Sequence, residues 1–293
     1  MKVISWNLLH GMAIPPAQTA TGPGAKAEDA EDAEATDAAI ARLESAVLKL
    51  EVDVLGIQEI DLNQSRSMHV HHVQEIAQIM GTEHWAFAPT LIGTPGGKWR
   101  AVRKDVNATQ LELITSTSGR LTETAYGIGL ISKVPVKKWH RLELGRSIIG
   151  LPLAVPTKRG VGLAYVKDEP RVAIAAELEN GFTVAVTHLS FVPFVNYFQL
   201  KKMQRWISQV PGTPIIMGDL NLPWNLPEKS GWKSLALKKT YPSWSPKIQF
   251  DYILTSPKGL KAIVSKILTI PPLGVSDHLP IGVELTFKPL ELQ

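Results

Sequence analysis

The 293-residue sequence contains no cysteine. A disulfide framework, a thiolate nucleophile and a cysteine-bound zinc site are therefore excluded, and any metal must be held by oxygen and nitrogen ligands. The sequence also lacks an apolar run long enough to cross a membrane, and residues 1–7 lack the apolar segment of a secretory signal. These absences predict a cytoplasmic protein without a membrane span.

Acidic charge is concentrated in one segment that has little basic charge. Residues 17–37 hold six acidic residues and one lysine, although the whole chain has a net charge of +4. The segment has no large apolar side chain, so we expect a flexible acidic insertion in a single domain of residues 1–293. The remaining basic body suits a phosphorylated or polyanionic partner, although a lysine-rich solvated face gives the same balance. We expect a monomer.

Apolar periodicity predicts three amphipathic helices. The first starts at Thr36 or Asp37 and buries Ile40, Leu43, Val47 and Leu50. The second ends at Gly81 and buries Val70, Val73, Ile76 and Met80. The third starts at Asn196 and buries Leu200, Met203, Ile207 and Val210. His69, His71 and His72 are assigned to the second helix as surface residues, because no carboxylate completes a zinc ligand set there. Residues 149–170 are expected to be an irregular surface excursion.

Polar residues follow or end the predicted strands. Strands are predicted at residues 2–6, 53–58, 126–132, 171–178, 182–187, 214–217, 249–255 and 281–287. The polar residues at or near the strand ends are Asn7, Glu59, His188, Asp219, Asn221, Asp251, Asp277 and His278. Strand ends in layered α/β proteins converge on one cleft, which predicts a single site. Carboxylate and amide ligands suit Mg²⁺ or Mn²⁺, and no G-x-S-x-G motif offers a serine nucleophile, so the set favours metal-assisted hydrolysis of a phosphate ester.

The same residues form motifs in a familiar order. These are Ser5-Trp6-Asn7, Gln58-Glu59, Thr187-His188-Leu189, Gly218-Asp219-Leu220-Asn221, Asp251-Tyr252-Ile253 and Ser276-Asp277-His278. Over residues 3–284 the chain resembles the endonuclease/exonuclease/phosphatase superfamily, which has the deoxyribonuclease-I-like fold. Arg66-Ser67, Tyr126-Gly127, Glu169-Pro170-Arg171 and Thr240-Tyr241-Pro242-Ser243 further resemble a bacterial branch of family hydrolases. The resemblance implies a four-layer α/β/β/α sandwich of two packed mixed β-sheets with outer helices.

The resemblance also implies roles. Glu59 is the expected principal Mg²⁺ ligand, with Asn7 and Asp277 nearby. Asp219, aided by Asn221, is expected to activate the attacking water. His278, oriented by Asp251, and His188 are expected to stabilise the phosphoryl oxygens. Glu123 is the candidate acidic partner of His188, while Arg66 and Tyr126 are candidate substrate-binding residues. The alternative for Asp251, Asp277 and His188 is a purely structural role.

Membership of such a family does not fix the substrate. A nuclease is favoured by the basic body and by the cluster Lys98, Arg100, Arg103 and Lys104, which we consider as a contact for a phosphate backbone. A plain solvated loop explains that cluster equally well. A phosphoinositide or sugar-phosphate phosphatase and a non-catalytic binding protein that keeps the fold stay open.

Overall fold

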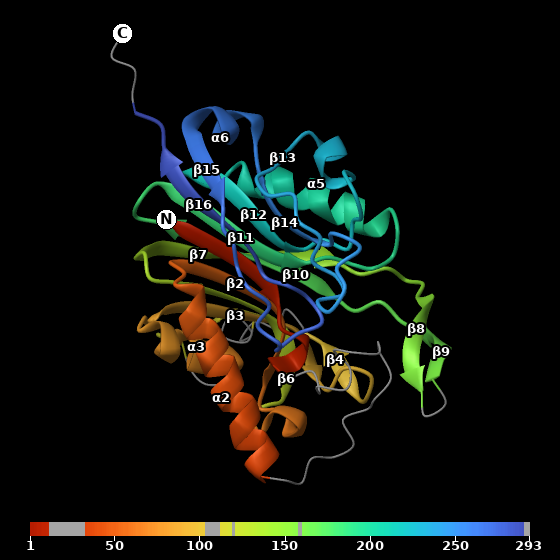
Figure 1. Cartoon of the computed structure of the whole chain (residues 1–293). Coiled ribbons are helices and arrows are strands. Elements are labelled where there is room, and N and C mark those ends of the chain that lie inside the picture. The colour runs from red at the N-terminus through yellow and green to blue at the C-terminus, as the bar shows by residue number, and fades with distance from the viewer. Residues whose placement is uncertain (12–32, 103–111, 119–120, 158–159, 290–293) are drawn as a thin grey trace.

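The computed structural model describes residues 1–11, 33–102, 112–118, 121–157 and 160–289, and Figure 1 shows their arrangement. Two β-sheets lie against one another. Helices α2 (Ala33–Leu50) and α3 (His72–Met80) cover the outer face of one sheet, and α5 (Val195–Ile207) covers the outer face of the other. The predicted four-layer sandwich is confirmed.

The first sheet contains both ends of the described chain. Its strand order is β15-β16-β1-β2-β6-β3-β4, with β5 paired to β3. The strands are β1 (Lys2–Asn7), β2 (Val54–Leu62), β3 (His84–Gly93), β4 (Trp99–Ala101), β5 (Ile114–Thr115), β6 (Ala125–Ser132), β15 (Ile263–Ile267) and β16 (Ile281–Phe287). Only β1 and β2 run parallel among the described strands of this sheet, so the ends of both strands lie at the same edge.

The second sheet has the strand order β13-β14-β12-β11-β10-β7. The strands are β7 (Val136–Gly145), β10 (Arg171–Leu178), β11 (Phe182–His188), β12 (Thr213–Asp219), β13 (Lys233–Ser234) and β14 (Asp251–Thr255). Here β11 and β12 form the parallel pair, with His188 opposite Asp219. Short helices η1 (Leu9–Gly11), η2 (Ser65–Ser67), η3 (Pro227–Ser230) and α6 (Pro257–Ala262) lie in the connections.

The core between the sheets is apolar and closely packed. Strands of both sheets contribute fully buried residues such as Val3, Ile174 and Val186 to it. Gly56 of β2 faces the second sheet, and a Cβ there would lie 2.5 Å from Met217 Cε. A side chain at this position would push the sheets apart, since protein interiors have few voids that accommodate added atoms.

Two helix boundaries differ from the prediction. Helix α2 starts at Ala33, so residues 33–37 are helical rather than part of the expected insertion, whose remaining residues lie outside the described chain. Leu43, Val47 and Leu50 are buried as predicted, whereas the side chain of Ile40 lies outside the described part. In α5, Leu200, Met203 and Ile207 are buried, but Val210 lies beyond the end of the helix.

The histidines near α3 differ most from expectation. The helix starts at His72, His71 is its N-cap, and His69 lies before it with a positive φ of 58°. Only His69 is exposed. His72 is buried and its Nδ1 accepts a hydrogen bond from the backbone of Asp61 at 3.1 Å, while the His71 ring packs edge-on against Trp85. The prediction of surface positions is therefore wrong for His71 and His72, because their rings fill gaps between α3 and the first sheet. Val70 also precedes the helix and is half-buried, whereas Val73, Ile76 and Met80 are buried as predicted.

Residues 149–170 do form a surface excursion, but the prediction that it is irregular is wrong. Strands β8 (Leu151–Thr157) and β9 (Gly160–Val166) form an antiparallel hairpin that projects from the body at the right of Figure 1. The prolines and glycines of this segment obscured its strand pattern. Pro152 and Pro156 are tolerated in β8 because neither strand of the hairpin has a second neighbour among the described strands. None of the described helices combines the length and the apolar character that a membrane crossing requires.

Candidate active site

Strand pairing brings the predicted polar residues to one edge of the sandwich. In the second sheet, His188, Asp219 and Asp251 lie side by side on three adjacent strands. In the first sheet, Asn7 ends β1, next to Gln58 of β2. Asn7 connects the two sheets, because its Nδ2 donates to Asp219 Oδ2 at 3.1 Å and to Glu59 Oε1 at 2.9 Å.

Glu59 does not end its strand as predicted. Strand β2 continues to Leu62, and its pairing with β6 is interrupted between Ile57 and Ile60. Glu59 sits in this β-bulge with a φ of 53°, in the left-handed region that a residue with a side chain seldom adopts. The bulge therefore turns the Glu59 side chain toward Asn7. Backbone strain of this kind is tolerated where the surrounding structure holds it, and it is common at functional sites.

Burial tends to raise the pKa of Glu59, but the neighbouring His188 and His10 imidazoles and the hydrogen bond from Asn7 lower it to about 2. Glu59 is consequently an ionised carboxylate that is still about one-fifth exposed. Asn7 Oδ1 accepts a hydrogen bond from the backbone of Leu9 at 3.1 Å. The amide nitrogen of Asn7 rather than its oxygen therefore faces the carboxylates.

His278 is held by a buried carboxylate. Its Nδ1 lies 2.8 Å from Oδ2 of Asp251, which is the first residue of β14 rather than an interior one as predicted. Burial lowers the pKa of His278, but the charge and hydrogen bond of Asp251, together with Asp219 and Asp277, outweigh it and raise that pKa well above its ordinary value. His278 is therefore a charged imidazolium, and its Nε2 lies 3.8 Å from Asp219 Oδ2.

His188 lies on the other side of Asp219, with its Nε2 3.7 Å from Asp219 Oδ2. Asn221 Nδ2 lies 3.2 Å from the same nitrogen and donates to the carbonyl of Leu189 at 3.0 Å. An amide NH₂ only donates, so His188 Nε2 is an acceptor and carries no proton. Burial and the nearby Arg171 guanidinium lower the pKa of His188 to about 3, in agreement with a neutral ring.

Asp219 is the buried carboxylate between the two imidazoles. Its Oδ1 accepts from the backbone of Asn221 at 2.9 Å. Burial raises the pKa of Asp219 to about 7, with His278 opposing and Asp251 reinforcing this shift. A carboxyl group with a pKa near neutrality both accepts and releases a proton, which is the property required of a general base.

The loop that carries His278 is fixed from both sides. Ser276 Oγ donates to the carbonyl of Asn7 at 2.6 Å and accepts from the backbone of His278 at 3.1 Å. The Tyr241 ring packs against the imidazole with the ring centroids 4.9 Å apart. Asp277 is half-exposed beside it, and burial, opposed by His278 and reinforced by Glu59, raises its pKa to about 6.

The residues Arg66 and Tyr126 lie in a neighbouring cluster. Arg66 forms a bidentate ion pair with Asp61 at 2.8 Å, and its guanidinium carbon lies 5.9 Å from the centre of the Tyr126 ring. His10, which sequence reasoning missed, completes the cluster, with Nε2 4.0 Å from Glu59 and its ring 5.5 Å from that of Tyr126. Its only sequence signal is its place three residues after Asn7.

Arg100, in the basic cluster around Trp99, has an acidic partner of its own. Arg100 lies in β4, and its Nη2 donates to both carboxylate oxygens of Glu123 at 2.8 and 2.9 Å, with both side chains about half exposed. Glu123 is therefore the partner of Arg100, and its assignment to His188 is wrong. Lys98 precedes β4 and is exposed, while Arg103 and Lys104 lie outside the described residues.

The donor set fits a divalent cation. The charge of Asp251 raises the pKa of Asp219, and the charges of Glu59 and Asp251 raise that of Asp277, while His278 lowers both. Ligand atoms of Asp219, Asp251 and His278 lie within 4.8 Å of one another, although the hydrogen bond between Asp251 and His278 already accounts for that closeness. The buried Asp251 Oδ1 has no hydrogen-bond partner among the residues that the structure describes. Hard oxygen donors of this kind suit Mg²⁺ or Mn²⁺.

A cavity of about 300 Å³ adjoins His278. Its wall includes Trp244, Leu273 and Pro272 and carries no ionisable side chain apart from His278. The hydroxyl groups of Ser243 and Ser276 in the wall are already donating to backbone carbonyl groups. The cavity therefore suits an uncharged and largely apolar part of a substrate.

A family profile and several solved structures are similar to this chain. The profile of the Endonuclease/Exonuclease/phosphatase family matches residues 4–278. No curated protein matches the chain in sequence. A family protein from Bacteroides thetaiotaomicron has a similar structure, with a TM-score of 0.57, 12% identity and 98% of each chain covered.

Two further solved structures are similar. A mannosyl-6-phosphatase from the same organism has a TM-score of 0.53 and 13% identity, with 98% of this chain and 100% of that chain covered. The catalytic domain of human Nocturnin, with a bound sulfate anion, has a TM-score of 0.51 and 16% identity, with 98% and 94% covered. At such identities the likeness establishes the fold.

Proposed function

The chain belongs to the endonuclease/exonuclease/phosphatase family, whose members hydrolyse phosphoester bonds, and we propose that Asp219 activates the attacking water in this chain. The observation that carries the proposal is the position of Asp219 between two imidazoles of opposite protonation state, with a pKa of about 7. A base of this strength takes a proton from water and afterwards releases it at neutral pH.

Each neighbouring residue has a distinct proposed role. The charged His278, held by Asp251, stabilises the negative charge that grows on the phosphoryl oxygens during in-line displacement. Neutral His188 and Asn221 orient the phosphoryl group and the water by hydrogen bonds. Asn7 holds the carboxylates of Glu59 and Asp219 in place relative to one another, by donating a hydrogen bond to each of them. Arg66 and Tyr126 contact the substrate beyond Glu59.

Glu59 and Asp277, with Asn7 beside them, are the proposed holders of Mg²⁺, and Mn²⁺ is the alternative. A divalent cation there supplies charge neutralisation and polarisation of a phosphoryl oxygen. The nearness of the carboxylates supports this assignment, since burial and then the charges of Glu59 and Asp251 raise the pKa of Asp277 against the opposing effect of His278.

A phosphate monoester or diester with an apolar organic group is the proposed substrate class. The apolar cavity beside His278 offers a place for that group. The structural likeness to a mannosyl-6-phosphatase favours a monoester. The exposed ion pair of Arg100 with Glu123 reduces the support for a nuclease, because Glu123 offsets the positive charge of Arg100. We also propose a cytoplasmic location and a monomer.

The experiment is hydrolysis of p-nitrophenyl phosphate, bis-p-nitrophenyl phosphate and plasmid DNA with Mg²⁺, Mn²⁺ or EDTA. Asp219→Ala serves as the blank, and Glu123→Gln serves as a control that removes a carboxylate outside the site. EDTA-sensitive turnover that only Asp219→Ala abolishes supports the proposal and ranks monoester, diester and DNA. Metal binding without turnover on any of these substrates favours a non-catalytic binding protein.

A further inference from the structure

Large apolar side chains are exposed in three segments near the active site: residues 148–165, which include the β8–β9 hairpin, the start of α5, and the loop after β12. We call this set the apolar rim; each member is more than half exposed, and Ile148 is fully exposed. Its members are Ile148, Ile149, Leu163, Tyr165, Phe194, Phe198 and Trp224. Soluble proteins seldom gather exposed apolar side chains in this way unless the surface binds a partner.

Three polar contacts, two of them buried and one partly buried, hold these segments together. Asp168, at the base of the β8–β9 hairpin, accepts from the backbone of Ser147 at 2.6 Å and from Ser190 Oγ at 2.8 Å. Asn196 of α5 donates to the carbonyl of Asn221 at 2.8 Å. These contacts therefore fix the hairpin, the start of α5 and the loop after β12 to one another. Ser190, which makes one of them, lies two residues after His188 of the active site.

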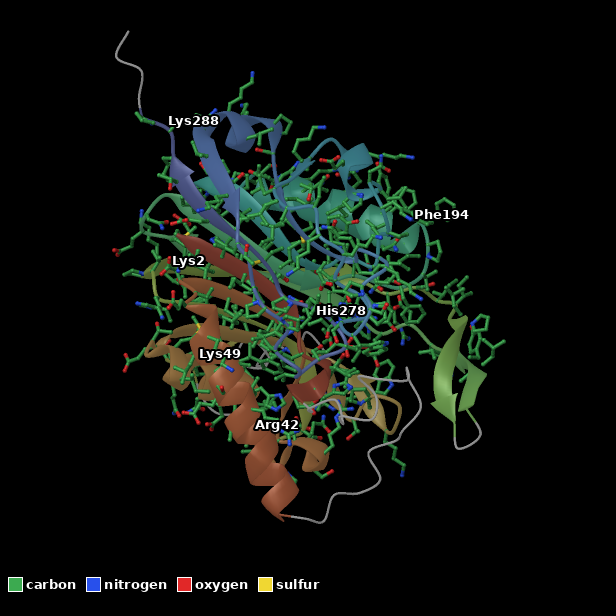
Figure 2. The ribbon with its side chains drawn as sticks, in the orientation of Figure 1. Lys2, Arg42, Lys49, Phe194, His278 and Lys288 are labelled. Carbon is green, nitrogen blue, oxygen red and sulfur yellow. The ribbon has the colours of Figure 1, made fainter. Side chains whose placement is uncertain are left out.

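The hairpin has an exposed apolar face. Leu163 and Tyr165 alternate in β9 and project from the same face, and both are exposed. The Tyr165 hydroxyl accepts from the backbone of Gly150 at 2.7 Å, which fixes the ring although its surface is free. A two-stranded hairpin is marginally stable by itself in water, so a surface that covers this face would stabilise it. Figure 2 shows Phe194 at the side of the molecule on which the hairpin extends.

The charge pattern identifies the kind of partner. Between Glu143 and Asp168 the sequence has no acidic residue and four basic ones, namely Arg146, Lys158, Arg159 and Lys167. Residues 189–207 likewise contain three basic residues and no acid. Apolar side chains in segments whose charged residues are basic, as in residues 144–167 and 189–207, match a bilayer with anionic headgroups, where the apolar groups enter the interface and the basic ones attract the surface charge.

We propose that the apolar rim docks this protein reversibly on the surface of an anionic lipid bilayer. The docked protein presents the His188 side of the active site to the bilayer, because Ser190 and Asn221 connect that side to the rim. Together with the proposed function, this makes phosphate esters at a membrane surface accessible to the site.

The test is co-sedimentation of the full chain with vesicles of phosphatidylcholine alone or mixed with phosphatidylglycerol. We expect binding to the mixed vesicles, weakening with salt, and a loss of about tenfold or more in the double variant Leu163→Ser, Phe198→Ser. The matched control is Val264→Ser, Ile267→Ser in β15, which removes two apolar side chains of about 50% exposure elsewhere. Lys167→Glu is expected to weaken binding about fivefold or more.

Circular dichroism and turnover of soluble p-nitrophenyl phosphate check that the rim variants stay folded and active. Unchanged turnover with lost vesicle binding supports docking as a property separate from catalysis. Failure of the wild type to bind the mixed vesicles at low salt overturns the proposal, as does equal binding by the rim and control variants. A dimer in size-exclusion chromatography that only the rim variants dissociate also overturns it, because the rim is then an interface between copies.

Discussion

His278 and His188 lie on opposite sides of one carboxylate and differ in charge. Both rings are buried and both Nε2 atoms lie within 4 Å of Asp219 Oδ2. The Nδ1 of His278 lies 2.8 Å from the Asp251 carboxylate, and His278 is protonated. The Nε2 of His188 lies 3.2 Å from the Asn221 amide, Arg171 is nearby, and His188 is neutral. The protonation state of each imidazole is thus decided by its neighbours other than Asp219, namely Asp251 for His278 and Arg171 for His188. This asymmetry provides one positive group and one neutral hydrogen-bonding group around the attacking water.

The largest expected effect comes from removing the carboxylate between the two rings. Asp219→Asn keeps the shape of the side chain but removes the proposed base, and we expect turnover to fall by about 10³-fold or more. Steady-state hydrolysis of p-nitrophenyl phosphate with Mg²⁺ measures it. Turnover within tenfold of wild type, with the variant folded by circular dichroism, would contradict the role of Asp219.

Asp251→Asn makes the two rings alike and is expected to have the next largest effect. Loss of the neighbouring charge lowers the pKa of His278, so less of it is protonated at neutral pH. We expect turnover to fall about 10²-fold at pH 7.5 and the ratio of wild type to variant to shrink toward pH 6, where His278 regains its proton. The pH profile of kcat/KM measures this ratio, and a ratio independent of pH would show that Asp251 acts only on structure.

The two rings are also expected to give opposite pH dependences of stability. The folded pKa of His188 is lowered to about 3, so its contribution is lost as pH falls from about 6.5 toward 3. The folded pKa of His278 is raised, so its contribution is complete below about 6.5 and is lost as pH rises through the folded value. The loss in free energy of unfolding caused by His188→Gln should therefore become smaller by about 1 kcal/mol as the pH is lowered from 7 to 5.5. The loss caused by His278→Gln should become smaller as the pH is raised above 7.

Urea unfolding in EDTA measures both losses, and the wild type measured at each pH serves as the reference. If the losses in free energy of unfolding caused by the two substitutions changed in the same direction with pH, the two imidazoles would carry the same charge.

The smallest expected effect lies outside the pair. Arg100→Ala breaks an exposed ion pair with Glu123 and should change kcat/KM for p-nitrophenyl phosphate by less than about twofold. The same assay on plasmid DNA sharpens the result. A selective loss on DNA of tenfold or more would restore the basic cluster as a nucleic-acid contact.

Much of the fold and of the site is readable from the sequence, because local period and motif order are properties of the chain itself. The predicted strands 171–178 and 281–287 coincide with β10 and β16. The strand-end residues Asn7, His188 and Asp219 do converge, as expected where parallel strands end at one edge. The helix faces also follow from spacing, since Leu200, Met203 and Ile207 are buried.

The sequence by itself therefore determined the family, the layered architecture and the residue types of the site. Only the tertiary structure decided how those residues act, because their states depend on contacts between distant segments. Asn7 meets Asp219 across 212 positions, the bulge at Glu59 exists through pairing with β6, and His10 joins the site only through the turn after β1. The charges of His188 and His278 depend on Arg171 and Asp251, and pKa values respond to distance and burial, which the order of residues does not contain.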